Sequence, residues 1–412
     1  MFRQITIGLL LLISCSVLAQ EGTTSPYSYY GIGTLKFRGT VENRAMGGLG
    51  IFADSIHINL QNPAAYSNLR LTTFTAGVSY QRSTQKSLDN SHSATTTTLD
   101  YFGLGIPMGK FGLGFGVLPY SSVGYDFYTE MPDGVTEYSG DGGLNRAYLS
   151  IAYQVNPKLS IGIDGHYNFG KIENQSITQK SILQYGTRTI DNSKLGGITF
   201  NIGALYRTMI TQKLELTGSA TYTPETNLTS KNERKIATVE VTPAGIRTID
   251  EREIEVANTD FSFPSQFTLG AAISKPQHWG MGVEYSNQQW NKINSKITDS
   301  ERATYNNAST IRLGGYYIPE YNSFTNYYKR VVYRAGMRYE QTGLSIDGQD
   351  INEFGISFGL GMPVGRLFSN INLGLEVGRR GTKNNGLIQE NFFNASLSFS
   401  LNDLWFEKRL YN

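Results

Sequence analysis

The feature that most constrains the fold of this chain is a two-residue alternation of apolar and polar side chains. Odd positions carry Leu159, Ile161 and Ile163, while even positions carry small or polar residues. Successive side chains of a strand point to opposite faces, so each such segment has one apolar and one polar face. The same pattern recurs in the segments 111–117, 198–206, 279–285, 371–377 and 393–401.

Three observations favour a membrane barrel over a soluble all-β protein, which remains the alternative. The alternating runs last for about 10 to 14 residues, whereas soluble strands usually last for about five or six. Charged residues share the polar parity of their strands, where a barrel lumen tolerates them. These residues are Arg146, Asp164, Arg207, Glu284, Arg312, Arg334, Arg338 and Glu376. The third observation is the spacing of the connections.

Residues 71–412 divide into about fourteen alternating segments, which predicts an all-β fold, a transmembrane antiparallel β-barrel. Short connections are expected near Gly109, Asn156, Thr211, Pro276 and Gly365, and they alternate with longer ones, as in bacterial outer-membrane barrels. The longer connections are expected at 83–93, 128–143, 175–193, 227–260, 294–304, 342–350 and 381–388. Two exceptions are a long 319–328 connection and Asp100, which shares the apolar parity and therefore requires a strand end or a bulge.

The N-terminus predicts export from a Gram-negative cell to the outer membrane. Residues 1–19 have a basic Arg3, an apolar stretch and small residues at Val17 and Ala19, as in a cleaved signal peptide. Cleavage removes Cys15, the only cysteine, so no disulfide or thiol chemistry is expected. The alternative is a lipoprotein, in which Cys15 is acylated. The formal net charge of +2 argues against a strongly basic nucleic-acid binder.

Residues 20–70 lack the alternation and are rich in glycine, so they are not expected to form spanning strands. A barrel of about fourteen strands has a lumen too wide for side chains alone to fill. We therefore expect residues 20–70 to form an N-terminal plug inside the lumen. A periplasmic or partly disordered extension is the alternative.

Several short stretches resemble the FadL/TodX family of outer-membrane transporters for hydrophobic compounds. The resemblance rests on 44–54, on Gln61-Asn62-Pro63-Ala64, on a Pro…Gly…Trp…Tyr…Trp pattern from 263 to 290, and on 333–339. It implies fourteen strands, an N-terminal hatch, and a kinked third strand that opens a hole in the wall. Glu284 replaces the usual Asp of the pattern, and the ligand-pocket residues of the family cannot be matched here.

Two candidate sites follow, neither of them catalytic. The hatch motif comprises Arg44, Gly47, Gly48, Gly50, Asn62, Pro63 and Ala64. The candidate lateral gate comprises Pro119, Tyr120, Ser121, Ser122 and Gly124, because proline cannot donate to a strand ladder and belongs at edges or bulges. The alternatives are a static turn for the hatch motif and a strand end above the membrane for Pro119.

The predicted function is outer-membrane transport of fatty-acid-like hydrophobic small molecules, captured by the outer loops and released sideways through the third strand. The alternative is a non-transporting barrel that serves as a scaffold or subunit of an outer-membrane secretion or assembly machine. An apolar pocket beneath the outer loops favours transport, whereas a filled lumen with an apolar outer ledge favours the scaffold.

The expected partners are membrane lipid, a hydrophobic ligand and, in the alternative, a protein bound through the outer loops; no nucleic acid, metal or cofactor is expected. His166 shares a strand face with Asp164 and Ser160, but same-face neighbours lie about 7 Å apart along a strand, so no hydrolytic triad is expected. Six aromatic residues are expected in girdles near the outer strand ends. They are Tyr80, Tyr167, Tyr222, Tyr285, Trp290 and Tyr339.

Overall fold

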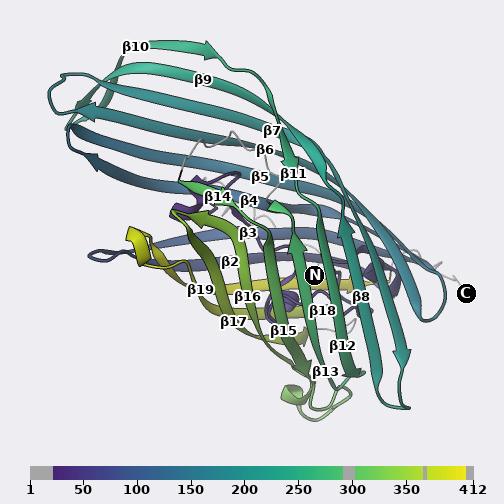
Figure 1. Ribbon diagram of the computed structural model, residues 1–412. Helices are drawn as coiled ribbons and strands as arrows, with labels where there is room; N and C mark the ends of the chain where they lie inside the picture. The colour runs from purple at the N-terminus through teal and green to yellow at the C-terminus, as the bar shows by residue number, and fades with distance from the viewer. Residues whose placement is uncertain (1–21, 291–301, 365–368, 405–412) are drawn as a thin grey trace, which may run out of the picture.

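The computed structural model describes residues 22–290, 302–364 and 369–404, and its strands form one antiparallel sheet rolled into a barrel (Figure 1). The predicted signal peptide, Cys15 and the turn near Gly365 lie outside the described residues. The strands of the wall are β2 (Thr72–Lys86), β3 (Ser91–Met108), β4 (Phe111–Met131), β5 (Gly134–Gln154), β6 (Leu159–Lys180), β7 (Gly186–Met209), β8 (Glu215–Thr223), β12 (Gln266–Lys275), β13 (Trp279–Gln288), β15 (Ala308–Tyr317), β16 (Val332–Ile346), β17 (Gln349–Val364), β18 (Ser369–Arg380) and β19 (Gln389–Asp403).

These fourteen described strands close into a ring, because β19 pairs with β2 along its whole length, from Gln389 opposite Lys86 to Asp403 opposite Thr72. The two faces have the predicted parity. On β6, Ile161 and Tyr167 point outward and are exposed, whereas Asp164 points inward and is buried. The closed all-β barrel predicted from the alternation is therefore confirmed. No described helix is long and apolar enough to cross a membrane.

Asp100 lies at a bulge, which is one of the two arrangements that its parity allowed. On the β2–β3 ladder Gly77 pairs with Tyr101 and Val78 pairs with Leu99, so Asp100 has no partner opposite it. Because of this extra residue, the Asp100 side chain points into the barrel like the other strand charges. Ser79 Oγ donates a hydrogen bond to Asp100 Oδ1 at 2.8 Å.

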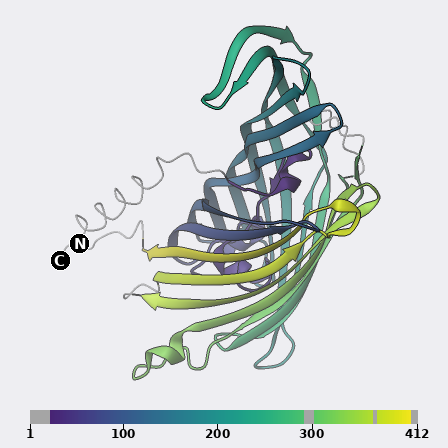
Figure 2. The same cartoon turned by 90° about the vertical axis from the view of Figure 1, so that its left-hand side faces the viewer.

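One side of the barrel extends far beyond the other, and this extension is called the wing. It consists of the distal halves of β4–β7 together with β9 (Thr226–Thr242) and β10 (Gly245–Glu255), and β11 (Thr259–Phe263) leads back to β12 (Figures 1 and 2). The expectation of loops at 128–143, 175–193 and 227–260 was wrong, since these ranges are mostly strand. Polar side chains lie on both faces of these strands, so their sequences lack the alternation and resemble those of loops. The opposite end of the barrel, which carries the predicted short turns, is called the short-turn end.

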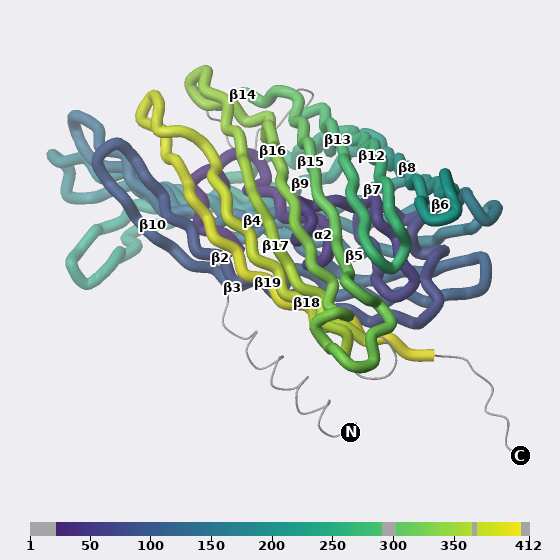
Figure 3. Tube along the Cα trace, turned by 90° about the horizontal axis from the view of Figure 1, so that it is seen from below, coloured from purple at the N-terminus to yellow at the C-terminus, as the bar shows by residue number. Residues whose placement is uncertain are grey.

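The N-terminal residues 22–70, called the inner segment, lie within the ring of strands (Figure 3). Only short elements interrupt their irregular path, because glycines and prolines prevent longer ones. These elements are η2 (Pro26–Tyr29), β1 (Thr34–Leu35), α2 (Val41–Arg44) and η3 (Pro63–Asn68). Asn62 begins η3 by accepting a hydrogen bond from the Ala64 N–H at 3.0 Å.

The remaining short elements lie in connections between strands. They are β14 (Ala303–Tyr305), η5 (Tyr327–Arg330) and η6 (Asn384–Gly386). The connection that contains η5 is the long one expected at 319–328, although it lies at the short-turn end.

Most of the expected girdle aromatics point outward, but Trp290 does not. Tyr80, Tyr167, Tyr222, Tyr285 and Tyr339 are exposed on the outer face. Trp290 is instead 7% exposed and stacks near Tyr305 inside the barrel. It lies two residues beyond the end of β13, where the parity of the strand no longer applies.

Candidate functional site

The wall of the barrel is split between β3 and β4 toward the wing end. These strands pair only from Met108 opposite Phe111 to Phe102 opposite Val117. Beyond this point β3 remains paired with β2, and β4 remains paired with β5. The strand β4 has a bulge at Tyr120. Two strand edges therefore diverge where the third strand was predicted to open, and edges of this kind expose unpaired backbone groups.

A short part of the inner segment, residues 28–36, covers the free edge of β4 and is called the latch. Within it β1 pairs with β4, with Thr34 opposite Ser122 and Leu35 opposite Ser121. The Lys36 N–H donates to the Tyr120 carbonyl at 2.9 Å. The latch therefore takes the place that β3 leaves vacant in the ladder.

Side chains reinforce this pairing. Ser121 Oγ donates to the Ile32 carbonyl at 2.7 Å, and Ser28 Oγ both donates to the Gly124 carbonyl and accepts from its N–H at 3.1 Å. Gly33 has φ +87, and a Cβ there would lie 2.3 Å from the Ser122 carbonyl oxygen, so only glycine allows this approach. Four of the five predicted gate residues thus bond directly to the latch.

Behind the latch lies an apolar cluster rather than an open pocket. Ile32 packs with Val123, Leu144, Phe263 and Trp290, all buried. The Arg146 guanidinium lies 4.3 Å from the centroid of the Tyr120 ring and 5.6 Å from that of Phe263.

The predicted hatch motif binds to strands from different parts of the ring. The Gly47 N–H donates to Ser357 Oγ at 2.9 Å, and the Gly50 N–H donates to Glu284 Oε2 at 3.0 Å. Asn62 Nδ2 donates to the Ala204 carbonyl at 3.1 Å.

The other motif residues also contact the wall or the interior of the segment. Arg44 lies 3.8 Å from Asp100 and donates to Ser396 Oγ at 3.4 Å. Pro63 and Ala64 are buried, and they lie against Gly162 and Gly203, which have no side chains to exclude them. The tight turn at Gly47 and Gly48 has φ values of +71 and +90.

The lumen between the inner segment and the wall is polar and densely ion-paired. Arg312 donates to Glu284 at 2.9 Å, and Arg338 lies 3.0 Å from Glu376. Glu353 binds both Arg338 and Arg380. Further pairs join Arg38 to Asp164 at 3.3 Å and Arg380 to Glu390 at 3.7 Å. The cavity left among these groups has a volume of about 220 Å³.

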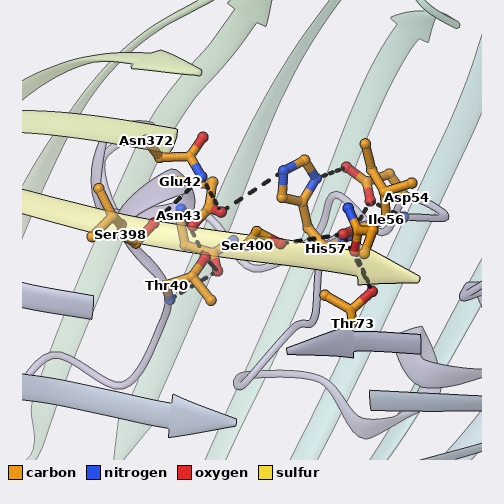
Figure 4. Close-up of polar contacts among 12 residues, drawn as sticks. Thr40, Glu42, Asn43, Asp54, Ile56, His57, Thr73, Asn372, Ser398 and Ser400 are labelled. Atoms are coloured by element: carbon orange, nitrogen blue, oxygen red, sulfur yellow. Dashed lines mark hydrogen bonds and ion pairs between the residues drawn. The ribbon is translucent and has the colours of Figure 1, made fainter. Parts of the chain in front are cut away.

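A second cavity, of about 370 Å³, lies at the short-turn end, and Figure 4 shows the polar contacts of Glu42, Asp54 and His57, which line it. His57 Nδ1 lies 2.6 Å from Asp54 Oδ2, and its Nε2 lies 3.8 Å from Glu42 Oε1. Burial alone would lower the pKa of His57, but the Asp54 carboxylate outweighs that effect and raises the pKa. The ring is thus held toward its protonated form between two carboxylates.

The neighbours of His166 on its strand face do not form a hydrogen-bonded triad with it. His166 Nε2 lies 3.7 Å from Asp164 Oδ2, which is beyond hydrogen-bonding distance. The serine that donates to this carboxylate is Ser150 on β5, not Ser160. The described residues also hold no group of three or more His, Cys, Asp or Glu side chains arranged to bind a metal ion.

Sequence reasoning missed the latch residues Ser28 and Thr34 and the cavity residues Glu42 and His57. Nothing in the alternation pointed to them, because they lie in the irregular inner segment. The only available signal was their position within fifty residues of glycine-rich sequence ahead of the barrel.

Comparison with known families gives a match over the whole sequence. The family model described as BamG matches residues 1–412. The chain belongs to the BamG family. A comparison of this BamG-family chain with curated proteins found no match.

Several solved structures share its fold. The toluene transporter TodX of Pseudomonas putida is 15% identical, with 90% of this chain and 100% of that chain covered and a TM-score of 0.60. The toluene transporter TbuX of Ralstonia pickettii is 16% identical, with 89% and 99% covered and a TM-score of 0.59. A Pseudomonas aeruginosa FadL homologue is 13% identical, with 90% and 98% covered and a TM-score of 0.55. These similarities confirm the predicted resemblance to the FadL/TodX type at the level of the fold.

Proposed function

We propose that this protein lies in the outer membrane and passes hydrophobic small molecules through its wall into the membrane. The observation that carries the proposal is the split between β3 and β4, which the latch closes. In a closed barrel every strand is paired on both sides. The β3–β4 ladder stops after the pair Phe102–Val117, and the backbone groups left unpaired beyond it carry a cost in free energy. Latch movement would open a lateral passage from the apolar cluster to the lipid.

The polarity of the lumen supports a sideways route over an axial one. A hydrophobic solute that moved along the axis would have to pass buried ion pairs such as Arg312–Glu284 and Arg338–Glu376. Separating a buried pair leaves charges uncompensated and costs about 3–5 kcal/mol. The route through the split meets Ile32, Leu35 and Val123 instead. Toluene transporters are among the solved structures with this fold, so a monoaromatic hydrocarbon is the first probe.

Regularising β4 tests this proposal. Replacing Pro119–Gly124 by a regular alternating strand, with the bulge at Tyr120 deleted, should abolish uptake of radiolabelled toluene by cells while the barrel still folds. The physical reason is that β4 could then pair with β3 beyond Val117. Heat-dependent migration on gels reports folding. Uptake equal to that of the unmodified protein would contradict lateral release.

A second candidate function, a subunit of an outer-membrane protein complex, is favoured by a different observation. An apolar hollow of about 1250 Å³ lies on the outside of the wall. Its sides include Tyr80, Leu313, Met337, Phe358 and Leu375, all exposed. Contiguous apolar surface of this kind is typical of binding sites, although lipid also contacts a barrel wall.

A substitution that fills the hollow distinguishes transport from a role as a subunit of a complex. Ala335 lines it, so Ala335→Trp should displace a membrane partner that is cross-linked in native membranes and identified by mass spectrometry. Ala147→Trp, which changes an outward alanine on β5, is the matched control. An unchanged set of cross-linked proteins in Ala335→Trp would contradict a subunit docked in this hollow.

A further inference from the structure

The cavity of about 370 Å³ at the short-turn end has an apolar side and a polar side. Its apolar side is formed by Met46, Phe52, Ile58, Tyr316 and Ile318. Its mouth is lined by residues of the short-turn end, including Gln277, Tyr321, Arg330 and Pro363. A volume of this size lies within the range of ligand sites and holds one large side chain with its backbone.

The polar side is organised by Asn372. Its Nδ2 donates to Glu42 Oε1 at 2.7 Å, and its Oδ1 accepts from Arg334 Nη1 at 3.2 Å. One amide thus holds a carboxylate and a guanidinium side by side, and His57 lies next to Glu42 (Figure 4).

Two atoms of this polar side lack hydrogen-bond partners. Glu42 Oε2 and His57 Nε2 are both buried without a hydrogen bond, and Glu42 is only 6% exposed. A buried polar atom without a partner costs about 1–3 kcal/mol. Glu42 Oε2 can therefore accept a hydrogen bond from a ligand. When the His57 ring is protonated, its Nε2–H can donate one, and the Arg334 guanidinium lies beside these two groups.

We infer that this cavity binds the free C-terminal residue of a peptide that enters from the short-turn end and carries an apolar side chain. A terminal residue has a carboxylate and an amide N–H within one residue. The carboxylate would accept from Arg334 and His57, and the amide N–H would donate to Glu42 Oε2. The apolar side chain would pack against Phe52, Tyr316 and Ile318. The inference is independent of the transport proposal.

Fluorescence anisotropy of the full chain in detergent provides the test. The probe is a fluorescein-labelled Gly-Gly-Gly-Phe peptide with a free carboxylate, and its amidated twin is the comparison. The free acid should bind about tenfold more tightly than the amide, because a charged hydrogen bond is lost in the amide. Glu42→Gln and Arg334→Gln should each weaken binding of the free acid. Arg188→Gln, which breaks an exposed ion pair with Glu251 in the wing, should leave it unchanged.

Three results would overturn the inference. They are equal binding of acid and amide, no binding at millimolar peptide, and displacement of the peptide by decanoate at matching concentration. The last would identify a site for amphiphilic anions in general.

A labelling experiment keeps the test valid if the polar variants fail to fold. In a Cys15→Ser background, a bulky maleimide on Gln277→Cys at the cavity mouth should abolish binding relative to the same unlabelled protein. The same label on Lys110→Cys, which lies in a different short turn, should not. Binding that survives modification of residue 277 would place the peptide elsewhere.

Discussion

Oxidising a cysteine pair introduced at positions 34 and 122 should stop hydrophobic uptake, and reduction should restore it. Thr34 and Ser122 are opposite each other on antiparallel strands, where Cα atoms lie about 4.5–5.5 Å apart. That separation suits a disulfide. The bond would fix the latch to β4 and keep the split covered. Uptake of radiolabelled toluene with and without reductant, in a Cys15→Ser background, measures the effect.

The control is a cysteine pair at Thr129 and Thr136, which are also opposite each other but join β4 to β5 within the wing. Its oxidation should leave uptake unchanged. If the 34–122 pair is fully oxidised and uptake continues at the original rate, the latch is not the gate.

Substituting Gly336 by valine should make the barrel leak small polar solutes. A Cβ on Gly336 would lie 2.2 Å from the Met46 carbonyl carbon and 2.3 Å from the Gly47 nitrogen. The inner segment would have to move away from the wall at this close contact, with a cost of about 1–3 kcal/mol or more. The Gly47 bond to Ser357 would be lost with it. Arabinose-driven swelling of liposomes should rise several-fold.

The matched control is Gly218→Val, because a Cβ at Gly218 meets no atom within 4 Å. It should leave permeability unchanged. Deleting residues 20–60 should give the upper limit of the leak. If that deletion does not leak, the inner segment does not block the lumen.

The sequence was sufficient to predict the wall of this barrel, since the alternation is a local consequence of strand geometry. It assigned the inward charges correctly and required either a strand end or a bulge at Asp100, and the structure has the bulge. Pro119, together with the resemblance to the FadL/TodX family, also predicted an irregular third strand.

What the sequence could not predict depends on contacts between distant segments. The wing was missed because strands that are polar on both faces resemble loops. Trp290 was misplaced because it follows the end of its strand. The latch pairs residues 34–35 with 121–122, and no local pattern records such a pairing.

The inner segment is bonded to β7, β13, β17 and β19, which lie all around the ring. These contacts form most directly if the segment is in place before the cylinder closes. We therefore expect residues 22–70 to be held in place while the later strands wrap around them, with the pairing of β19 and β2 as the last step. Because this final pairing joins the two ends of the described sheet, loop-closure entropy makes it slow. The half-wrapped protein, with both of those edges bare, is the state that most needs protection from other chains.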